Sequence, residues 1–169
     1  LHQGLYHVYL ANDGTCFNMY YWDNKWTIST TSGYDMNNVM WYNKTYQDLI
    51  SECLNKNNTN WESFTASLNK KCCYSFGFKH PNFHRFIGNT NGYKLWHIQT
   101  VNLDLDSPEY LWSCDETPME QIPNQELYEG KLDNIKDLYK IASDAIDRYL
   151  ENPTSEPCFG FILRSANFS

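Results

Sequence analysis

Hydrophobic and polar positions alternate near the start of the chain. The alternation predicts a strand from Tyr6 to Leu10, and aromatic and β-branched runs predict two more, from Cys16 to Trp22 and from Trp26 to Thr31. The residues Asp23-Asn24-Lys25 between the last two suit a short hairpin loop. The first thirty residues are therefore predicted to form antiparallel sheet.

Apolar residues recur at three- and four-residue steps in three later segments, and this spacing predicts helices. Thr45 is a candidate N-cap for a helix from Tyr46 to Leu54, a second helix is predicted from Trp61 to Leu68, and the clearest runs from about Asp133 to Leu150. The apolar stripe of the last helix consists of Ile135, Leu138, Tyr139, Ala142, Ala145, Ile146 and Tyr149.

Three further segments complete the pattern. Strands are predicted from Cys72 to Phe78, from Tyr93 to Leu105 and from Cys158 to Arg164. The acidic, proline-bearing stretch from Ser107 to Gly130 is predicted to be loop with a short helix near Gln125. Strands and helices follow one another without a βαβ rhythm, so the predicted fold class is α+β with mainly antiparallel sheets and flanking helices. A length of 169 residues favours a single domain over residues 1–169.

Composition and charge narrow the classes of function. The chain carries 13 Lys and Arg against 20 Asp and Glu, a formal net charge of -7, which disfavours binding to long nucleic acid through counterion release. Aromatic residues make up 17% of the sequence, which favours a packed core over disorder. No run approaches the roughly 18 apolar residues of a membrane span, so an intracellular, cytoplasmic location without membrane contact is expected.

Two sets of side chains are compatible with either a binding role or a purely structural role. His80 and His84 lie near Cys72 and Cys73, and a metal site is conceivable, but Pro81 keeps the histidines off one regular helix, which favours surface histidines and reduced core thiols. No metal site is predicted. On an alternating hairpin, half of the aromatic residues must face the core, and the outward half stays open for a ligand or partner. These hairpin aromatics are Tyr20, Tyr21, Trp22 and Trp26.

Four short segments in order carry a family resemblance. They are "ANDGT" (Ala11 to Thr15), "WTISTTSG" (Trp26 to Gly33), "YSFGFKHP" (Tyr74 to Pro81) and "FGFILR" (Phe159 to Arg164). Together they resemble motifs I, Ia, III and IV of the phage-type RNA ligases, which are members of the covalent nucleotidyltransferase superfamily. The resemblance implies the nucleotidyltransferase (ATP-grasp-like) domain of RNA ligases, and ATP and Mg²⁺ as cofactors if its site still functions.

The resemblance also implies that the catalytic positions are degenerate. A motif I lysine attacks the α-phosphate of ATP in such ligases, and carboxylates of motifs III and IV hold ribose and metal. In this sequence the lysine position is Ala11, the carboxylate positions are Gly77 and Phe159, and the motif Ia cation position is Thr31. A methyl group cannot act as a nucleophile, so no catalytic residue is expected here. The family positions retained for nucleotide binding are Asp13, Gly14, Ser29, Phe78, Gly160 and Arg164.

The function expected from this resemblance is that of a pseudoenzyme. The leading hypothesis is a catalytically inactive RNA-ligase-like domain of viral origin that serves as a structural or protein-interaction module, with a protein partner or the remainder of a longer polypeptide. The first alternative is a non-catalytic module that binds a nucleotide or an RNA end. The second is an RNA ligase inactivated by a Lys to Ala change at position 11.

Overall fold

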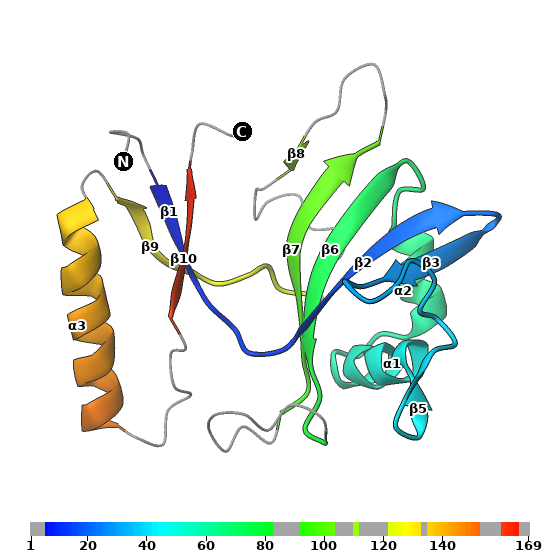
Figure 1. The fold of residues 1–169 in the computed structure, drawn as a ribbon, viewed down its shortest axis with the longest axis horizontal. Helices are drawn as coiled ribbons and strands as arrows, with labels where there is room; N and C mark the ends of the chain where they lie inside the picture. Colours follow the sequence, from blue (N-terminus) through cyan, green and yellow to red (C-terminus); the bar gives the residue numbers. More distant parts are fainter. Residues whose placement is uncertain are drawn as a thin grey trace. The chain divides into compact units, whose positions relative to one another are not determined.

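The computed structural model describes residues 6–82, 92–103, 110–111, 122–132, 135–152 and 160–165. The chain divides into two compact units, which are described separately (Figure 1). The terminal unit contains residues 1–13, 84–91 and 125–169, and the central unit contains residues 14–83 and 92–124. Both units combine antiparallel strands with helices, so the predicted α+β class is confirmed. The prediction of a single domain stays a prediction.

The central unit is built on a five-stranded antiparallel sheet with the order β3-β2-β6-β7-β8. The β2–β3 hairpin turns through Asp23 and Asn24, whose φ angles of 47° and 60° suit the two-residue turn that matches strand twist. A β-bulge interrupts the β6–β7 ladder between Ser75 and Phe76. The strands are β2 (Thr15–Trp22), β3 (Lys25–Ser29), β6 (Cys72–Lys79), β7 (Lys94–Asn102) and β8 (Tyr110–Leu111).

Two helices follow the hairpin. Helix α1 (Tyr46–Lys56) begins at Thr45, as predicted, because the Thr45 hydroxyl accepts from the Asp48 backbone and the Asp48 carboxylate accepts from the Thr45 backbone. Helix α2 (Trp61–Ser67) begins after Asn60, whose side chain accepts from the Ser63 backbone. A two-residue ladder of β4 (Met40–Trp41) and β5 (Lys44–Thr45) precedes α1.

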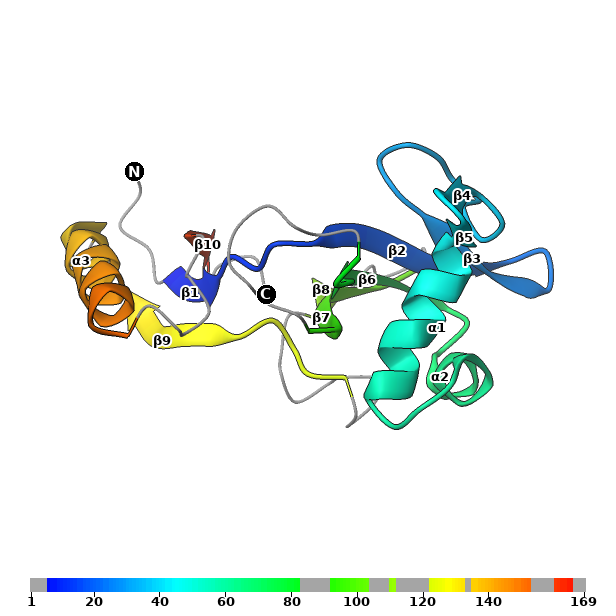
Figure 2. The same cartoon turned by 90° about the horizontal axis from the view of Figure 1, so that it is seen from below.

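The core of the central unit lies between one face of the sheet and the two helices, which Figure 2 shows on the same side of the sheet. Alternate residues of β2 and β6 point toward the helices, as the period of two requires. The opposite face therefore carries the other half of each strand, including Gly77. The fully buried large side chains of this core are Phe17, Met19, Ile28, Leu49, Ile50, Leu54, Phe64, Phe76, Phe78 and Ile122.

The terminal unit has a smaller core. Its three-stranded antiparallel sheet has the order β10-β1-β9, with β1 (Tyr6–Leu10) in the middle, β9 (Leu127–Leu132) and β10 (Phe161–Ser165). Helix α3 (Ile135–Glu151) packs beside this sheet. The core consists of Val8, Leu132 and Ile141, with Leu138 and Phe161 packed against it.

The structure corrects two predictions for the terminal unit. No helix forms near Gln125, because residues from Leu127 onward pair with β1, and this long-range pairing overrides the local proline and glycine signals. The apolar stripe of α3 is also not buried throughout, since Tyr139 is 81% exposed and Ile146 is 59% exposed. Among the α3 side chains that the structure describes, the buried one is Ile141, which is outside the predicted stripe. The predicted start of the last strand, Cys158 to Gly160, precedes β10, and residues 158 and 159 lie outside the described residues.

The described part of the chain contains no helix that is both long enough and apolar enough to cross a membrane.

Candidate functional site

Gly77 lies opposite a tryptophan at the position where the resemblance places the motif III carboxylate. It pairs with Cys16 of β2 on one side and Trp96 of β7 on the other. A Cβ atom at position 77 would lie 2.8 Å from Nε1 of Trp96 and still closer to two carbons of the ring. Trp96 is only 6% exposed. The indole therefore fills the space that a side chain at position 77 would occupy.

The same indole also restricts Gly14, the glycine of the Asp-Gly pair. A Cβ atom there would lie 2.7 Å from Cη2 of Trp96 and would clash with the backbone carbonyl oxygen of Phe78. Glycine at position 14 therefore allows its backbone to lie close to the Phe78 backbone and to the Trp96 ring, and any larger residue would prevent this approach. One side chain, Trp96, therefore packs against both Gly14 and Gly77 in the central unit.

In the terminal unit, Ala11 lies beside the motif IV segment. Its backbone N–H donates to the carbonyl oxygen of Gly160 at 2.9 Å, directly after the last residue of β1. Gly160 has a φ of 147°, a conformation that favours glycine. The structure therefore brings together two segments that lie about 150 residues apart in sequence. The side chain at this junction is a methyl group.

Arg164 of β10 is held by neighbours within the terminal unit. Its Nη2 donates to Oε1 of Gln125 at 2.6 Å, and its Cζ lies 4.5 Å from the centre of the Tyr9 ring. Gln125 in turn donates through Nε2 to the carbonyl oxygen of Leu10 at 3.0 Å. Burial lowers the pKa of the guanidinium, although Tyr9 opposes that change. These contacts tie Arg164 to the backbone immediately before Ala11.

Asp13, which the resemblance assigns to nucleotide binding, has an unsatisfied buried atom. Its Oδ2 is buried and has no hydrogen-bond partner among the described residues. A buried carboxylate oxygen without a donor is costly, so such an atom marks a place where a ligand or water is expected to supply one.

The other residues predicted for the site lie in different parts of the chain. Ser29 is half-buried at the end of β3, and Thr31 is exposed in the Thr30–Gly33 turn. Phe78 is fully buried in the hydrophobic core of the central unit. Phe159 lies outside the described residues.

His80 is fully buried, so the prediction that it is a surface histidine is wrong. Its Nδ1 accepts from the Asn82 backbone at 3.2 Å, and its Nε2 lies 2.9 Å from Oε2 of Glu52, which is also paired with Lys44. Burial raises the pKa of Glu52, but the hydrogen bonds from Lys44 and His80 lower it by more, so the pKa lies below its ordinary value. No local sequence pattern indicates that Glu52, which lies on α1, pairs with the His80 ring.

Four of the six cysteines lie in the described part of the chain. No group of three or more potential metal ligands occurs within the described ranges, and His84 lies outside them. Cys53 and Cys72 are buried, Cys73 is half-buried and Cys16 is exposed, and all four are free thiols. Burial raises the pKa of Cys53 to about 12, so that thiol stays protonated. Cys114 and Cys158 lie outside the described residues.

Two positions that the resemblance assigns to the ligase motifs lack the chemical groups that the reaction uses. Ala11 offers no amine for attack on a phosphate, and Gly77 offers no carboxylate for ribose or metal. The packing of Trp96 over Gly77 leaves no room to restore that carboxylate without moving the indole. The lysine and the motif III carboxylate that the resemblance implies for an active ligase are therefore both missing from the sequence at these positions.

Comparison with known proteins reveals viral relatives. The chain is 32% identical over 115 residues to a protein of African swine fever virus, isolate Tick/Malawi, named "Putative RNA-ligase", and 31% identical to the protein of the same name from isolate Pig/Kenya. The alignments cover 58% of this chain and 25% of each relative, so the chain spans about a quarter of their length. No protein-family model matches the chain. The relationship is therefore to viral RNA-ligase-like proteins.

The sequence pattern did not predict the roles of Trp96, which packs against Gly77, or of Gln125, which bonds to Arg164. Trp96 sits in a predicted strand, and the signal that could have found it is the glycine at position 77, because a glycine inside a strand often marks a close approach by another group. Gln125 was expected in a helix, and no local pattern reveals that it bridges Arg164 and Leu10.

Proposed function

We propose that this chain is a nucleotidyltransferase-type domain of the RNA-ligase kind that has lost self-adenylylation and acts as a non-catalytic interaction module. The relationship to the viral relatives supports the RNA-ligase type, and the antiparallel α+β sheets are compatible with it. A fold can persist after its chemistry has been lost, because function depends on the site rather than on the architecture.

The observation that carries the proposal is the packing of the Trp96 indole over Gly77. A lysine-to-alanine change at position 11 alone could be a single lost group in an otherwise intact site. The packing of the indole differs from a single substitution at position 11, because it involves several residues. The buried Trp96 ring is packed against a strand glycine as tightly as side chains in a protein interior. Loss of the carboxylate has therefore been followed by repacking of the space.

A labelling experiment tests the loss of chemistry. The 169-residue chain is incubated with Mg²⁺ and ATP labelled at the α-phosphate, then denatured and separated by electrophoresis. The proposal expects no label on the protein, and a working RNA ligase of the relatives' type run in parallel shows that the assay detects an adduct. A stable protein-AMP adduct on the native chain would overturn the proposal.

A second candidate function is non-catalytic binding of a nucleotide or an RNA end. The observation that favours it is the buried Oδ2 of Asp13, which lacks a donor among the described residues. Calorimetry with ATP, GTP and a short RNA would show saturable heat for the native chain and a weaker response for Asp13→Ala. Absence of heat for all three ligands would retire this candidate.

A further inference from the structure

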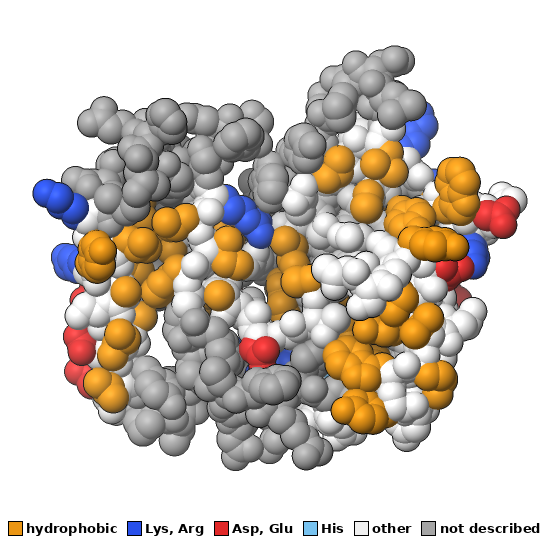
Figure 3. All heavy atoms as spheres, viewed as in Figure 1, with side chains coloured by type: hydrophobic (Ala, Val, Ile, Leu, Met, Phe, Trp, Pro, Cys, Tyr) orange, Lys and Arg blue, Asp and Glu red, His pale blue; other side chains and the backbone are white. Residues whose placement is uncertain are grey.

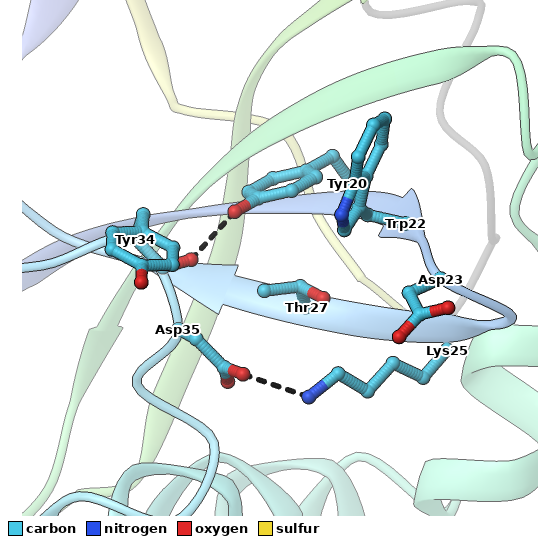
Figure 4. Close-up of a pocket in the computed structure, with 7 residues that line it drawn as sticks. All are labelled: Tyr20, Trp22, Asp23, Lys25, Thr27, Tyr34 and Asp35. Carbon is cyan, nitrogen blue, oxygen red and sulfur yellow. Dashed lines mark hydrogen bonds and ion pairs between the residues drawn. The ribbon is translucent and has the colours of Figure 1, made fainter.

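The β2–β3 hairpin of the central unit carries a pocket on the face of the sheet that points away from the helices. We call it the hairpin pocket; it has a volume of about 400 Å³ (Figure 4). Figure 3 shows hydrophobic side chains gathered at this end of the unit, next to acidic ones. Its lining residues are Tyr20, Trp22, Asp23, Lys25, Thr27, Tyr34 and Asp35.

Three aromatic side chains line the pocket, and two of them are largely in solvent. Trp22 is 71% exposed and Tyr34 is 81% exposed. Tyr20 is fixed in place, because its hydroxyl donates to the backbone carbonyl of Tyr34 at 2.6 Å. Tyr20 and Trp22 are the outward half of the hairpin aromatics, whereas Trp26 packs against the hydrophobic core. Large aromatic rings left exposed around a hollow commonly mark a binding surface.

The loop that closes the pocket is anchored to the edge strand β3. The buried side chain of Asn37 accepts from the Ile28 backbone at 2.8 Å and donates to the Trp26 carbonyl at 3.0 Å. These bonds hold the loop that bears Tyr34 and Asp35 against the strand. The pocket is thus formed before any ligand arrives, which reduces the entropy lost on binding.

The pocket has an excess of negative charge. Lys25 is paired with Asp35, with 2.7 Å between Nζ and Oδ2, and the hydrogen bond between them raises the pKa of Lys25 and lowers that of Asp35. Asp23 in the hairpin turn makes no ion pair with any described residue. One lysine against two aspartates leaves one uncompensated carboxylate beside the faces of the aromatic rings, which are themselves negative.

The floor of the pocket offers an unused hydrogen-bonding group. Thr27 is only 3% exposed, and its Oγ1 is buried without a hydrogen-bond partner among the described residues. Figure 4 shows the Thr27 side chain between Tyr20 and the Lys25–Asp35 pair. A hydroxyl oxygen in this setting can accept a hydrogen bond from a ligand N–H.

From this arrangement we infer that the hairpin pocket binds the guanidinium group of an arginine in a basic segment of a partner protein. A guanidinium is planar and cationic, stacks on aromatic faces, and presents several N–H donors that suit Asp23 and Thr27 together. The chain's net charge of -7 attracts such a segment over a distance and repels the phosphates of nucleic acid. The inference gives the proposed interaction module a partner class, and it does not depend on whether position 11 reacts.

The test uses two peptides that differ only in the charge at their arginine positions. One alternates arginine and glycine, and the other carries citrulline, the neutral isostere of arginine, at each arginine position. Binding to the 169-residue chain is followed by NMR through the signals of Trp22, Thr27 and Tyr34. The arginine peptide is expected to shift these signals saturably and to bind about five-fold or more tightly than the citrulline peptide. Equal affinity of the two peptides would overturn the inference.

Variants locate the binding and separate a basic peptide from nucleic acid. Trp22→Ala should weaken binding of the arginine peptide about three-fold or more. Tyr139→Ala, which removes an exposed aromatic ring from α3, should leave that binding unchanged. Lys25→Gln removes the competing ammonium and frees Asp35, so it should tighten the arginine peptide. Lys25→Gln would instead weaken the binding of a single-stranded oligonucleotide whose phosphates contact the lysine. An oligonucleotide that binds tightly to the native chain and more weakly to both Trp22→Ala and Lys25→Gln would therefore contradict the inference and identify a base-stacking site.

These outcomes are distinguishable from those of the proposed function. A chain that forms no AMP adduct and shows no arginine-specific binding retains the proposed loss of chemistry and loses the inferred partner class. A chain that forms the AMP adduct and binds the arginine peptide through Trp22 contradicts the proposed loss of chemistry and supports the inferred partner class.

Discussion

The indole of Trp96 on β7 lies over Gly77 on the neighbouring strand β6 and fills the volume that a side chain at position 77 would need. The two residues are direct partners across the ladder, on the sheet face away from the helices. An aromatic ring packed across a strand glycine compensates for the missing side chain. The indole occupies the space beside position 77 and leaves no room there for a carboxylate side chain.

The first prediction concerns the energy of this pair. Gly77→Ala should destabilise the chain by about 1–3 kcal/mol, because the added methyl group overlaps the indole and forces it or the strand to shift. Urea unfolding followed by circular dichroism measures the free energy of unfolding. In a Trp96→Ala background the same Gly77→Ala change should cost much less, since the ring is gone. Equal costs in the two backgrounds would show that the ring and position 77 are not coupled.

The second prediction concerns acid. Glu52 is paired with Lys44 and buried His80, and these bonds hold its pKa below the ordinary value despite burial. A lowered pKa in the folded state means that the carboxylate adds stability above its unfolded pKa and loses it as pH falls through the folded pKa. The free energy of unfolding should therefore fall with acid below about pH 4.5 in the native chain.

The matched variant for acid sensitivity is Glu52→Ala. It leaves the buried His80 ring without its carboxylate partner and should cost about 1–3 kcal/mol at pH 7. The difference between the native chain and the variant should shrink as pH falls from 6 to 3, since protonation removes the same interaction. A difference that stays constant over this range would contradict the assignment.

The third prediction concerns the start of α1. The reciprocal bonds between Thr45 and Asp48 satisfy two backbone N–H groups at the helix N-terminus. Thr45→Ala should destabilise the chain by about 1 kcal/mol in urea unfolding. Thr31→Ala, in the exposed turn after β3, is the control and should change stability little.

The fourth prediction concerns the thiols. Exposed Cys16 should react with iodoacetamide in the folded chain, while buried Cys53, whose pKa is raised to about 12 by burial, should react only after unfolding. Peptide mass spectrometry at increasing times gives the order of modification. Early modification of Cys53 would show that α1 opens from the sheet without global unfolding.

Local patterns in the sequence predicted most of the elements. The hairpin, the two helices of the central unit and the cap at Thr45 follow from short-range spacing, and each is found within a few residues of its predicted bounds. The strand β9 and the pairing of Gln125 with Arg164 could not be predicted, because they depend on β1, which lies more than a hundred residues earlier. Burial of His80 was missed for the same reason, since Glu52 satisfies it from another element.

The identities of the residues at positions 11 and 77 can be read from the sequence, but their packing cannot. The backbone bond between Ala11 and Gly160 joins segments about 150 residues apart, and no local spacing predicts it. The role of Trp96 depends on strand register, and the bulge after Ser75 sets which residue of β7 faces Gly77. No spacing rule within β7 alone marks that tryptophan.

The most direct test of the central claim restores the missing nucleophile alone. The variant Ala11→Lys is incubated with ATP and Mg²⁺, and its intact mass is measured beside that of the native chain. Because Gly77 supplies no carboxylate and the indole of Trp96 fills its place, we expect both proteins to keep their unmodified mass. A mass increase of one AMP on Ala11→Lys, located at position 11, would contradict the account and show that the lysine was the only missing part of a working site.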